Sequence, residues 1–135
     1  MDSGKTRVKT MDDETTLADL RGHVAAFVEA RDWEQFHTPK NLSCAVAIEA
    51  AELMEAFQWL SDEDAMAAMG DEEMRAAVID ELVDVLIYSL SLANALGISV
   101  SAAVLEKLRR NAHRFPVEAW RGRARSADRG ETGAD

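Results

Sequence analysis

The sequence predicts an all-α fold in which four main helices form a bundle-like arrangement. Apolar residues recur at intervals of three and four in four segments, which is the period of an amphipathic helix. Residues that cap helices precede several of these segments, and no alternating strand pattern or internal repeat is evident. Only two prolines and seven glycines interrupt 135 residues, of which 47% are hydrophobic. A chain of this length and composition is expected to form one domain with a packed core.

The first helix is expected to begin after Thr15 or Thr16 and to end near Arg31. A threonine hydroxyl accepts a hydrogen bond from the backbone of the first turn and so favours a helix start. The apolar stripe of this helix comprises Leu17, Leu20, Val24, Phe27 and Val28. The connection that follows, RDWEQFHTPKN, is rich in aromatic residues and carries Trp33 and His37.

The second helix is expected to run from Pro39 to about Leu60, with Thr38 as its cap. Proline suits the first position of a helix, because its fixed φ is helical and its missing N–H is not needed there. The apolar stripe of this helix comprises Leu42, Ala45, Val46, Leu53, Ala56, Phe57 and Leu60.

A short helix is expected between Ser61 and Gly70, because Ser61 and Asp64 have the spacing of a capping box and glycine favours a helix end. The longest helix is expected over residues 71–96, with Gly97 as its terminator. Its second half is apolar on nearly every side, which predicts that it is buried.

The last main helix is expected to begin after Ser99 or Ser101 and to end before Pro116. Its core-facing residues are expected to be Val104, Leu105 and Leu108, and a second face carries Lys107, Asn111 and Arg114. Residues 1–15 and 118–135 are polar, so we expect a flexible N-terminal tail and a disordered C-terminal tail around a domain at residues 16–117.

Two acidic pairs stand out, Glu49 with Glu52 and Glu81 with Asp84. Each has the spacing E-x-x-E/D, which brings both carboxylates to one face of a helix about 5–6 Å apart. Each pair interrupts an apolar surface, and Tyr88 continues the polar seam one turn beyond Asp84. Such pairs are costly to bury unless a cation neutralises them. Oxygen ligands of this kind suit Mg²⁺ or Mn²⁺. A single E-x-x-E is usually a solvated helix face, but two pairs in apolar surroundings favour a metal site.

The overall charge excludes some partners. A formal net charge of −10 argues against binding to a nucleic-acid polymer, which needs clustered Lys and Arg, but it leaves room for a free nucleotide held through a metal.

Cys44 is the sole cysteine and cannot form an internal disulfide, which suits a reducing compartment. The sequence has no apolar run of transmembrane length and no signal-peptide core. We therefore expect a soluble cytoplasmic protein that does not bind membranes.

Aromatic and basic residues extend the predicted site. Trp33 and Trp59 flank the second helix, where they could anchor a core or interface or could stack on a planar base. His37 has either a capping or a substrate-binding role. Lys107 and Arg114 could be solvent-facing charges or could offset the negative charge of the site. One divalent ion offsets only half the charge of four carboxylates, so a bound triphosphate requires a second metal or nearby basic residues.

These motifs together resemble the all-α nucleoside triphosphate pyrophosphohydrolases, and more narrowly the dCTP pyrophosphatase branch of the MazG-like proteins. The resemblance covers roughly residues 16–117. It rests on RDWEQFHTPKNL, E-x-x-E at Glu49 and Glu52, FQW at 57–59, E-x-x-D at Glu81 and Asp84 followed by VLIY, and K-x-x-x-N at Lys107 and Asn111 followed by RFP.

The resemblance implies a MazG-type fold and hydrolysis of a nucleoside triphosphate, such as dCTP or a modified dCTP, to the monophosphate and pyrophosphate. It implies Mg²⁺, with Mn²⁺ as a substitute, and a purpose in nucleotide pool sanitation. The catalytic and metal-binding residues would be Glu49, Glu52, Glu81 and Asp84. The substrate-binding residues are predicted to be Trp33, His37, Trp59, Tyr88, Lys107 and Asn111.

Three other functions are compatible with parts of this pattern. A related enzyme acting on dUTP or another nucleotide would share these motifs, and a helical interaction module without catalysis would use the acidic pairs only to set register. A di-metal oxygen-chemistry bundle needs Glu-x-x-His, which Glu49, Glu52 and Glu81 all lack.

A homo-oligomer is also expected, because the short neighbouring helices cannot cover the longest helix alone. The residues expected to lie against another chain are Val85, Leu86, Leu90, Leu92 and Leu96. The resemblance implies dimers or tetramers. We predict a tetramer with each site near a subunit boundary, where a neighbour lends an aromatic or basic residue.

Overall fold

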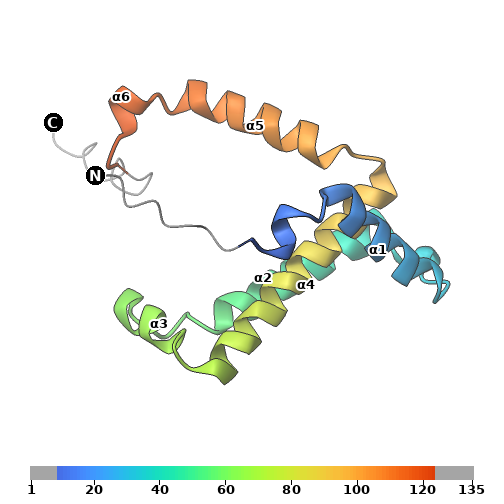
Figure 1. Ribbon diagram of the computed structural model, residues 1–135, viewed down its shortest axis with the longest axis horizontal. Coiled ribbons are helices and arrows are strands. Elements are labelled where there is room, and N and C mark those ends of the chain that lie inside the picture. The colour runs from blue at the N-terminus through green and yellow to red at the C-terminus, as the bar shows by residue number, and fades with distance from the viewer. Residues whose placement is uncertain (1–8, 124–135) are drawn as a thin grey trace, which may run out of the picture. The chain divides into compact units, whose positions relative to one another are not determined.

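The computed structural model describes residues 9–123, and every regular element in that range is helical (Figure 1). The elements are η1 (Met11–Asp13), α1 (Leu17–Glu29), η2 (Glu34–Phe36), α2 (Pro39–Glu55), α3 (Asp62–Ala68), α4 (Glu72–Leu96), α5 (Val100–Arg114) and α6 (Val117–Trp120). The prediction of an all-α fold is confirmed. Residues 1–8 and 124–135, which belong to the predicted tails, lie outside the described range.

The chain divides into two compact units, with the boundary between Ile98 and Ser99. The described part of the first unit runs from η1 to α4, and the second contains α5 and α6. Assignment of residues 16–117 to one domain stays a prediction.

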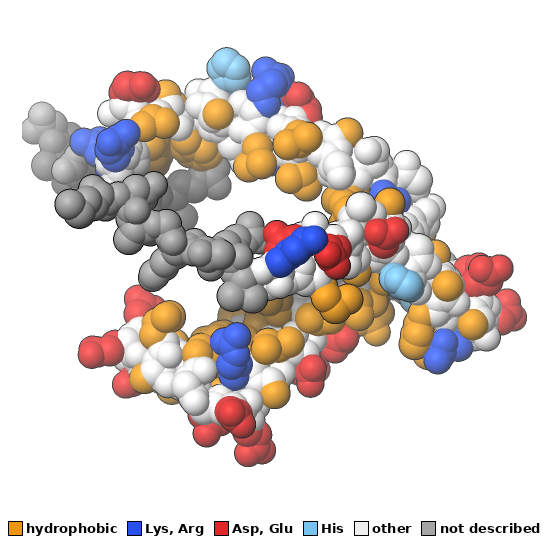
Figure 2. Space-filling model, viewed as in Figure 1, with side chains coloured by type: hydrophobic (Ala, Val, Ile, Leu, Met, Phe, Trp, Pro, Cys, Tyr) orange, Lys and Arg blue, Asp and Glu red, His pale blue; other side chains and the backbone are white. Residues whose placement is uncertain are grey.

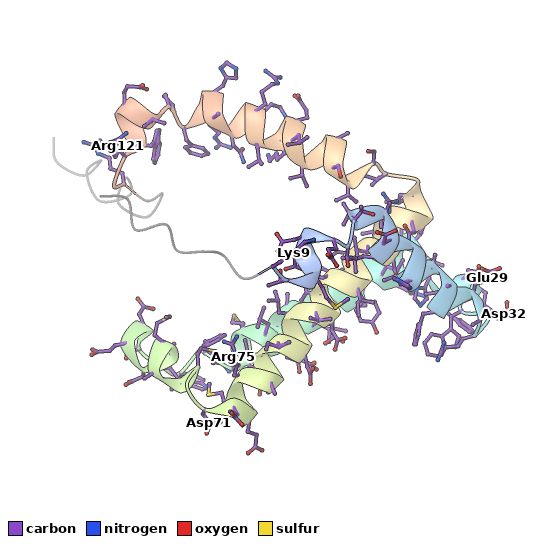
Figure 3. The ribbon with its side chains drawn as sticks, in the orientation of Figure 1. Lys9, Glu29, Asp32, Asp71, Arg75 and Arg121 are labelled. Atoms are coloured by element: carbon purple, nitrogen blue, oxygen red, sulfur yellow. The ribbon has the colours of Figure 1, made fainter. Side chains whose placement is uncertain are left out.

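Four of the predicted helix starts are confirmed by their caps, whereas α5 begins after Ser99 without a side-chain cap hydrogen bond. Four helices begin with a side-chain oxygen that accepts a hydrogen bond from a backbone N–H three residues later. The pairs are Thr16 with Asp19 at 3.1 Å, Thr38 with Asn41 at 3.2 Å, Ser61 with Asp64 at 3.1 Å and Asp71 with Met74 at 2.8 Å. Asp71 is labelled at the start of α4 in Figure 3. Each such cap contributes about 1 kcal/mol to stability.

The helix ends are less uniform. Gly97 ends α4 with a left-handed φ of 63°, and the N–H of Ile98 then bonds to the carbonyl of Ala93 at 2.9 Å. A side chain with a Cβ would be strained at that φ, which explains the glycine. The expectation that α2 extends to about Leu60 is wrong, because it ends at Glu55. The following residues make tighter turns, as in the 3.0 Å bond from the N–H of Leu60 to the carbonyl of Phe57.

The first unit is centred on α2 and α4, which pack against each other, while α1 contacts α4 (Figure 1). The two longer helices are antiparallel, since the start of α2 and the end of α4 line one pocket and their opposite ends line another. Arg21 on α1 joins Asn94 on α4 by two hydrogen bonds, at 2.8 and 3.1 Å, and also donates to the carbonyl of Ile98 at 2.6 Å. These bonds fix α1 against the end of α4.

The side chains that become buried in a single chain are few. Among the described residues, Val28, Leu42 and Ala93 are the buried hydrophobic ones, and Ser91 is buried with them. The expectation that the second half of α4 is buried is only partly met within one chain. Ser91 and Ala93 are buried, and Val85, Leu90 and Leu92 are half-buried, whereas Leu86 is 52% and Leu96 is 50% exposed. The reason is geometric, because α1 and α2 cover only part of the circumference of α4. Figure 2 shows hydrophobic side chains reaching the surface of the molecule.

Three short elements were not predicted. These are the two 3₁₀ turns and α6, which spans only four residues. Within residues 9–123, no single helix is long and apolar enough to cross a membrane; only α4 and α5, taken together as a bent pair, meet that test by length and composition.

Candidate metal and substrate site

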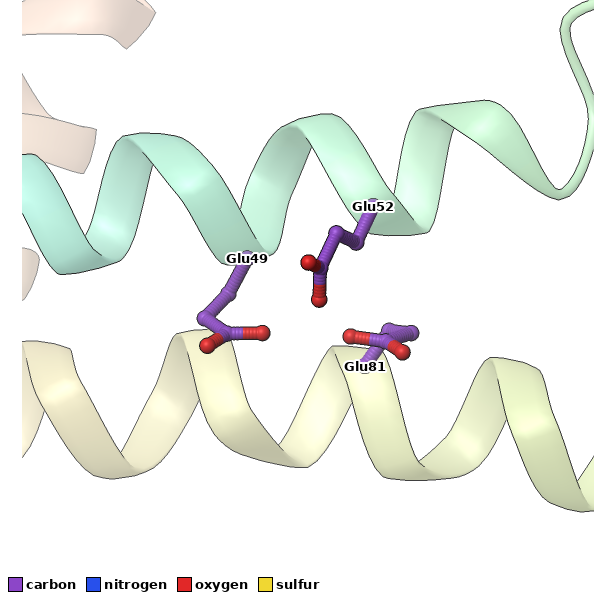
Figure 4. Close-up of side chains that lie close together, drawn as sticks. All are labelled: Glu49, Glu52 and Glu81. Carbon is purple, nitrogen blue, oxygen red and sulfur yellow. The ribbon is translucent and has the colours of Figure 1, made fainter.

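Three of the four predicted carboxylates converge between α2 and α4. Glu49 and Glu52 project from α2 toward Glu81 on α4 (Figure 4). One oxygen of each carboxylate lies within 4.8 Å of the other two. Glu49 and Glu81 are half-buried and Glu52 is exposed, so the cluster is open to solvent on one side.

Asp84 is half-buried on the same face of α4, one turn beyond Glu81. It is not among the three residues that meet the 4.8 Å criterion. Its negative charge nevertheless raises the pKa of both Glu49 and Glu81, so it lies within electrostatic range of the cluster.

The environment of the cluster disfavours negative charge. Loss of solvation, followed by a hydrogen bond to Glu52 and the charges of Glu52 and Asp84, raises the pKa of Glu49 to about 7. Loss of solvation is also the largest cause that raises the pKa of Glu81, followed by its hydrogen bond to Glu52. A proton or a metal cation would relieve the unfavourable charge.

The cluster has the donor set of a hard divalent cation. All of its ligand atoms would be carboxylate oxygens, which Mg²⁺ and Mn²⁺ prefer over softer donors. The Oε2 atom of Glu81 is buried and has no hydrogen-bond partner among the residues that the structure describes, so it is available to a ligand. Glu52 and Glu81 also line a pocket of about 410 Å³, which gives access from solution.

A second pocket, which we call the α1–α4 pocket, occupies about 450 Å³ at the other end of α2. Its lining comprises Ala25, Val28, Glu34, His37, Pro39, Ser91, Asn94 and Ala95. His37 was predicted from sequence to bind substrate, whereas Ser91 was not. The signal for Ser91 was its register, since it lies on the face of α4 that also carries Asp84 and Tyr88.

Trp33 is fixed next to this pocket by its aromatic neighbours. Its ring stacks on that of His37 with 6.5 Å between centroids and meets the ring of Phe27 edge-on at 5.8 Å. The guanidinium of Arg31 lies 3.6 Å from the Phe27 ring centroid and 5.8 Å from that of Trp33. Trp33 remains 41% exposed, which leaves ring surface for a ligand.

Trp59 is not brought together with Trp33. It follows α2, whereas Trp33 precedes it, and a helix of 17 residues is about 25 Å long. Trp59 is also 87% exposed. Tyr88 is half-buried between Asp84 and Ser91 on α4. That Trp59 and Tyr88 bind substrate stays a prediction.

The second unit has a basic pocket of its own. Lys107, Asn111 and Arg114 lie on it together, as their common helix face predicted. The pocket occupies about 560 Å³, and its other lining residues are Phe115, Trp120 and Arg123. The rings of Phe115 and Trp120 meet edge-on at 5.0 Å. Trp120 and Arg123 were not predicted as site residues, because no signal in the sequence indicated α6, which spans only four residues.

The chain matches the model of a known protein family, and the match extends over residues of both units. The MazG-like family matches residues 44–127, a range that includes both acidic pairs and the basic pocket. The chain therefore belongs to the MazG-like family.

More narrowly, the chain is similar to mammalian proteins named dCTP pyrophosphatase 1. It is 42% identical to the Mus musculus protein over 123 residues, which cover 91% of this chain and 72% of the relative. It is 44% identical to the Rattus norvegicus protein, over 82% of this chain and 65% of that relative, and 42% identical to the Homo sapiens protein, over 83% and 66%. The chain thus spans about two thirds of the length of these relatives.

A solved structure resembles the fold as well. A pyrophosphatase from Archaeoglobus fulgidus DSM 4304 superposes with a TM-score of 0.68 and 32% sequence identity. The match covers 82% of this chain and 96% of the archaeal one.

Proposed function

We propose that this protein is a Mg²⁺-dependent nucleoside triphosphate pyrophosphohydrolase, which converts dCTP or a modified dCTP to the monophosphate and pyrophosphate. The observation that carries the proposal is the convergence of Glu49, Glu52 and Glu81 between α2 and α4. The choice of substrate is supported by the mammalian relatives, and the purpose that fits it is sanitation of the nucleotide pool. A cytoplasmic location stays a prediction.

The spacing of the two pockets suits a nucleoside triphosphate. Glu81 and Ser91 lie on one face of α4, and ten residues of helix span about 15 Å. This is comparable to the length of an extended nucleoside triphosphate. The triphosphate would lie at the carboxylates and the base in the α1–α4 pocket, next to Trp33 and His37.

The carboxylates would hold the metal and also serve the chemistry. A bound Mg²⁺ would neutralise phosphate charge and lower the pKa of a coordinated water. A carboxylate that is not fully engaged would accept the proton of the attacking water. The water oxygen would bond to the α-phosphorus while the bond to the bridging oxygen breaks, and pyrophosphate would leave. Lys107 and Asn111 stay predicted contacts to phosphate or sugar.

A nucleotide panel with Mg²⁺ tests this function when pyrophosphate and orthophosphate are measured separately. The expected result is release of pyrophosphate from a pyrimidine deoxynucleoside triphosphate. A preference for dUTP over dCTP would indicate that the protein is the related enzyme that acts on dUTP. Orthophosphate alone would contradict the proposed bond cleavage. Absence of turnover on every nucleotide would favour the non-catalytic helical module.

We further propose a homotetramer, because α4 exposes a long apolar surface in a single chain. The exposed large residues on α4 are Ile79, Leu82, Val83, Leu86, Ile87 and Leu96. Burying such side chains against another copy would be favourable at about 25 cal/mol per Å². Another copy would also be needed to bring Trp59 to a base that contacts Trp33, since α2 separates the two rings within one chain.

A further inference from the structure

Ser91 is a buried serine whose hydroxyl makes no hydrogen bond within the described part of the chain. Its residue is 5% exposed, and its Oγ has no hydrogen-bond partner among residues 9–123. Ser89, two residues earlier, shows the usual solution for a serine in a helix, because its hydroxyl donates to the carbonyl of Val85 at 2.6 Å. A buried hydroxyl without a partner destabilises the fold, so its retention here needs an explanation.

The surroundings of Ser91 restrict what its partner can be. It lines the α1–α4 pocket, where the Nδ1 atom of His37 is likewise buried and without a partner among the described residues. Asn94 lines the same pocket, but both ends of its amide are engaged by Arg21. Small apolar residues form much of the remaining wall, namely Ala25, Val28, Pro39 and Ala95.

This combination suits a flat ring with a polar edge. A hydroxyl can both donate and accept, and an imidazole nitrogen can do either according to its tautomer. The two atoms come from different elements, because Ser91 lies on α4 and His37 directly after η2. The Trp33 ring stacked on His37 extends the aromatic side of the pocket. A ligand without polar groups would leave both polar atoms without a partner.

We propose that Ser91 is a base-selecting residue, whose hydroxyl hydrogen-bonds to the polar edge of the pyrimidine in the substrate. The inference rests on the proposed function and names a residue of that same site. A site built to hydrogen-bond a substrate discriminates strongly against analogues that lack the group, because its own polar atoms are then left unpaired. Ser91 thus contributes to substrate binding, whereas the carboxylate cluster carries the hydrolysis.

The test compares Ser91→Ala with Ser89→Ala on two substrates, dCTP and 2-deoxyribose 5-triphosphate, which has no base. We expect Ser91→Ala to lower kcat/KM for dCTP by about 10-fold, mainly through KM, as for loss of one hydrogen bond. Its kcat/KM for the base-free triphosphate should stay at the wild-type value. Ser89→Ala should leave both substrates unaffected, and Tm should not fall in Ser91→Ala because no protein hydrogen bond is lost.

The outcomes separate this inference from the function on which it rests. Wild-type turnover of dCTP combined with no loss in Ser91→Ala overturns the base-selecting role alone. An equal loss on both substrates also overturns it, since the effect would then not depend on the base. Absence of wild-type turnover on both substrates overturns the proposed function together with the inference.

Discussion

Replacement of Glu49 by glutamine probes the carboxylate cluster through stability as well as activity. The pKa of Glu49 is about 7 in the folded protein, above its ordinary value of 4.5. The fold therefore favours the protonated form, and this contribution to stability is fully present below pH 4.5 and lost as pH rises through 7. Glutamine imitates the protonated form at every pH. Without metal, Glu49→Gln should melt above the wild type at pH 8 and close to it at pH 4.5.

Added Mg²⁺ should reverse the order of the two melting temperatures, so that the wild type melts above Glu49→Gln. A ligand present at 100 times its Kd stabilises the folded state by about 2.7 kcal/mol. For a domain of this size, this corresponds to a rise in Tm on the order of 10 °C. Protons compete for the same oxygens, so the rise with Mg²⁺ should be largest above pH 7 and should shrink toward pH 5. Glu49→Gln should lose most of the rise and all turnover.

Thermal melts between pH 4.5 and pH 8, with and without Mg²⁺, measure both effects. Glu106→Gln provides a matched control, because the pKa of Glu106 is lowered by its hydrogen bonds to Arg109 at 2.9 Å. Its stabilising contribution therefore has the opposite sign, being present above its unfolded pKa and lost as pH falls. That variant should keep the full response to Mg²⁺. Retention of wild-type activity, or of the full metal response, in Glu49→Gln would refute the ligand assignment.

Three further predictions concern binding, assembly and the packing of α1. Trp33→Ala should weaken nucleotide binding by about 1–3 kcal/mol while turnover at saturating substrate changes less, and an unchanged KM would assign the ring to packing instead. Trp59→Ala should show the same loss in the assembled protein. Light scattering coupled to size exclusion should report a tetramer at micromolar concentration; an active monomer of 14.9 kDa would contradict the proposed interface. Asn94→Ala should lower the free energy of unfolding in urea by about 1–3 kcal/mol, because the polar groups of Arg21 lose their partner, and an unchanged urea midpoint would count against this tie.

The helix starts could be predicted because their signals are local. Thr38 and Ser61 cap helices within three residues of chain, so no knowledge of the rest of the molecule is needed. The end of α2 is a different case, because Phe57 to Leu60 continue its apolar period while their backbone has already tightened into turns. Periodicity records which side chains are apolar, and it does not record which hydrogen bonds the backbone makes.

In the candidate site, too, the features that depend on local spacing could be predicted and those that depend on packing could not. The spacing of Glu49 and Glu52 fixes their common face, and the setting of both acidic pairs in apolar surroundings predicted a metal site. Whether a polar side chain finds a partner depends on the elements packed around it, which spacing does not report. Ser89 and Ser91 are indistinguishable in the sequence, yet one is satisfied by its own helix and the other is not.

The hydrogen bonds between Arg21 and Asn94 also bear on the entropy of ligand binding. They join α1 to α4 at the α1–α4 pocket, and Asn94 is itself part of the lining. Walls tied in this way are already ordered before a ligand arrives, so less conformational freedom is lost on binding. The tie therefore acts as preorganisation. Its removal should make nucleotide association entropically less favourable even where no ligand contact is lost.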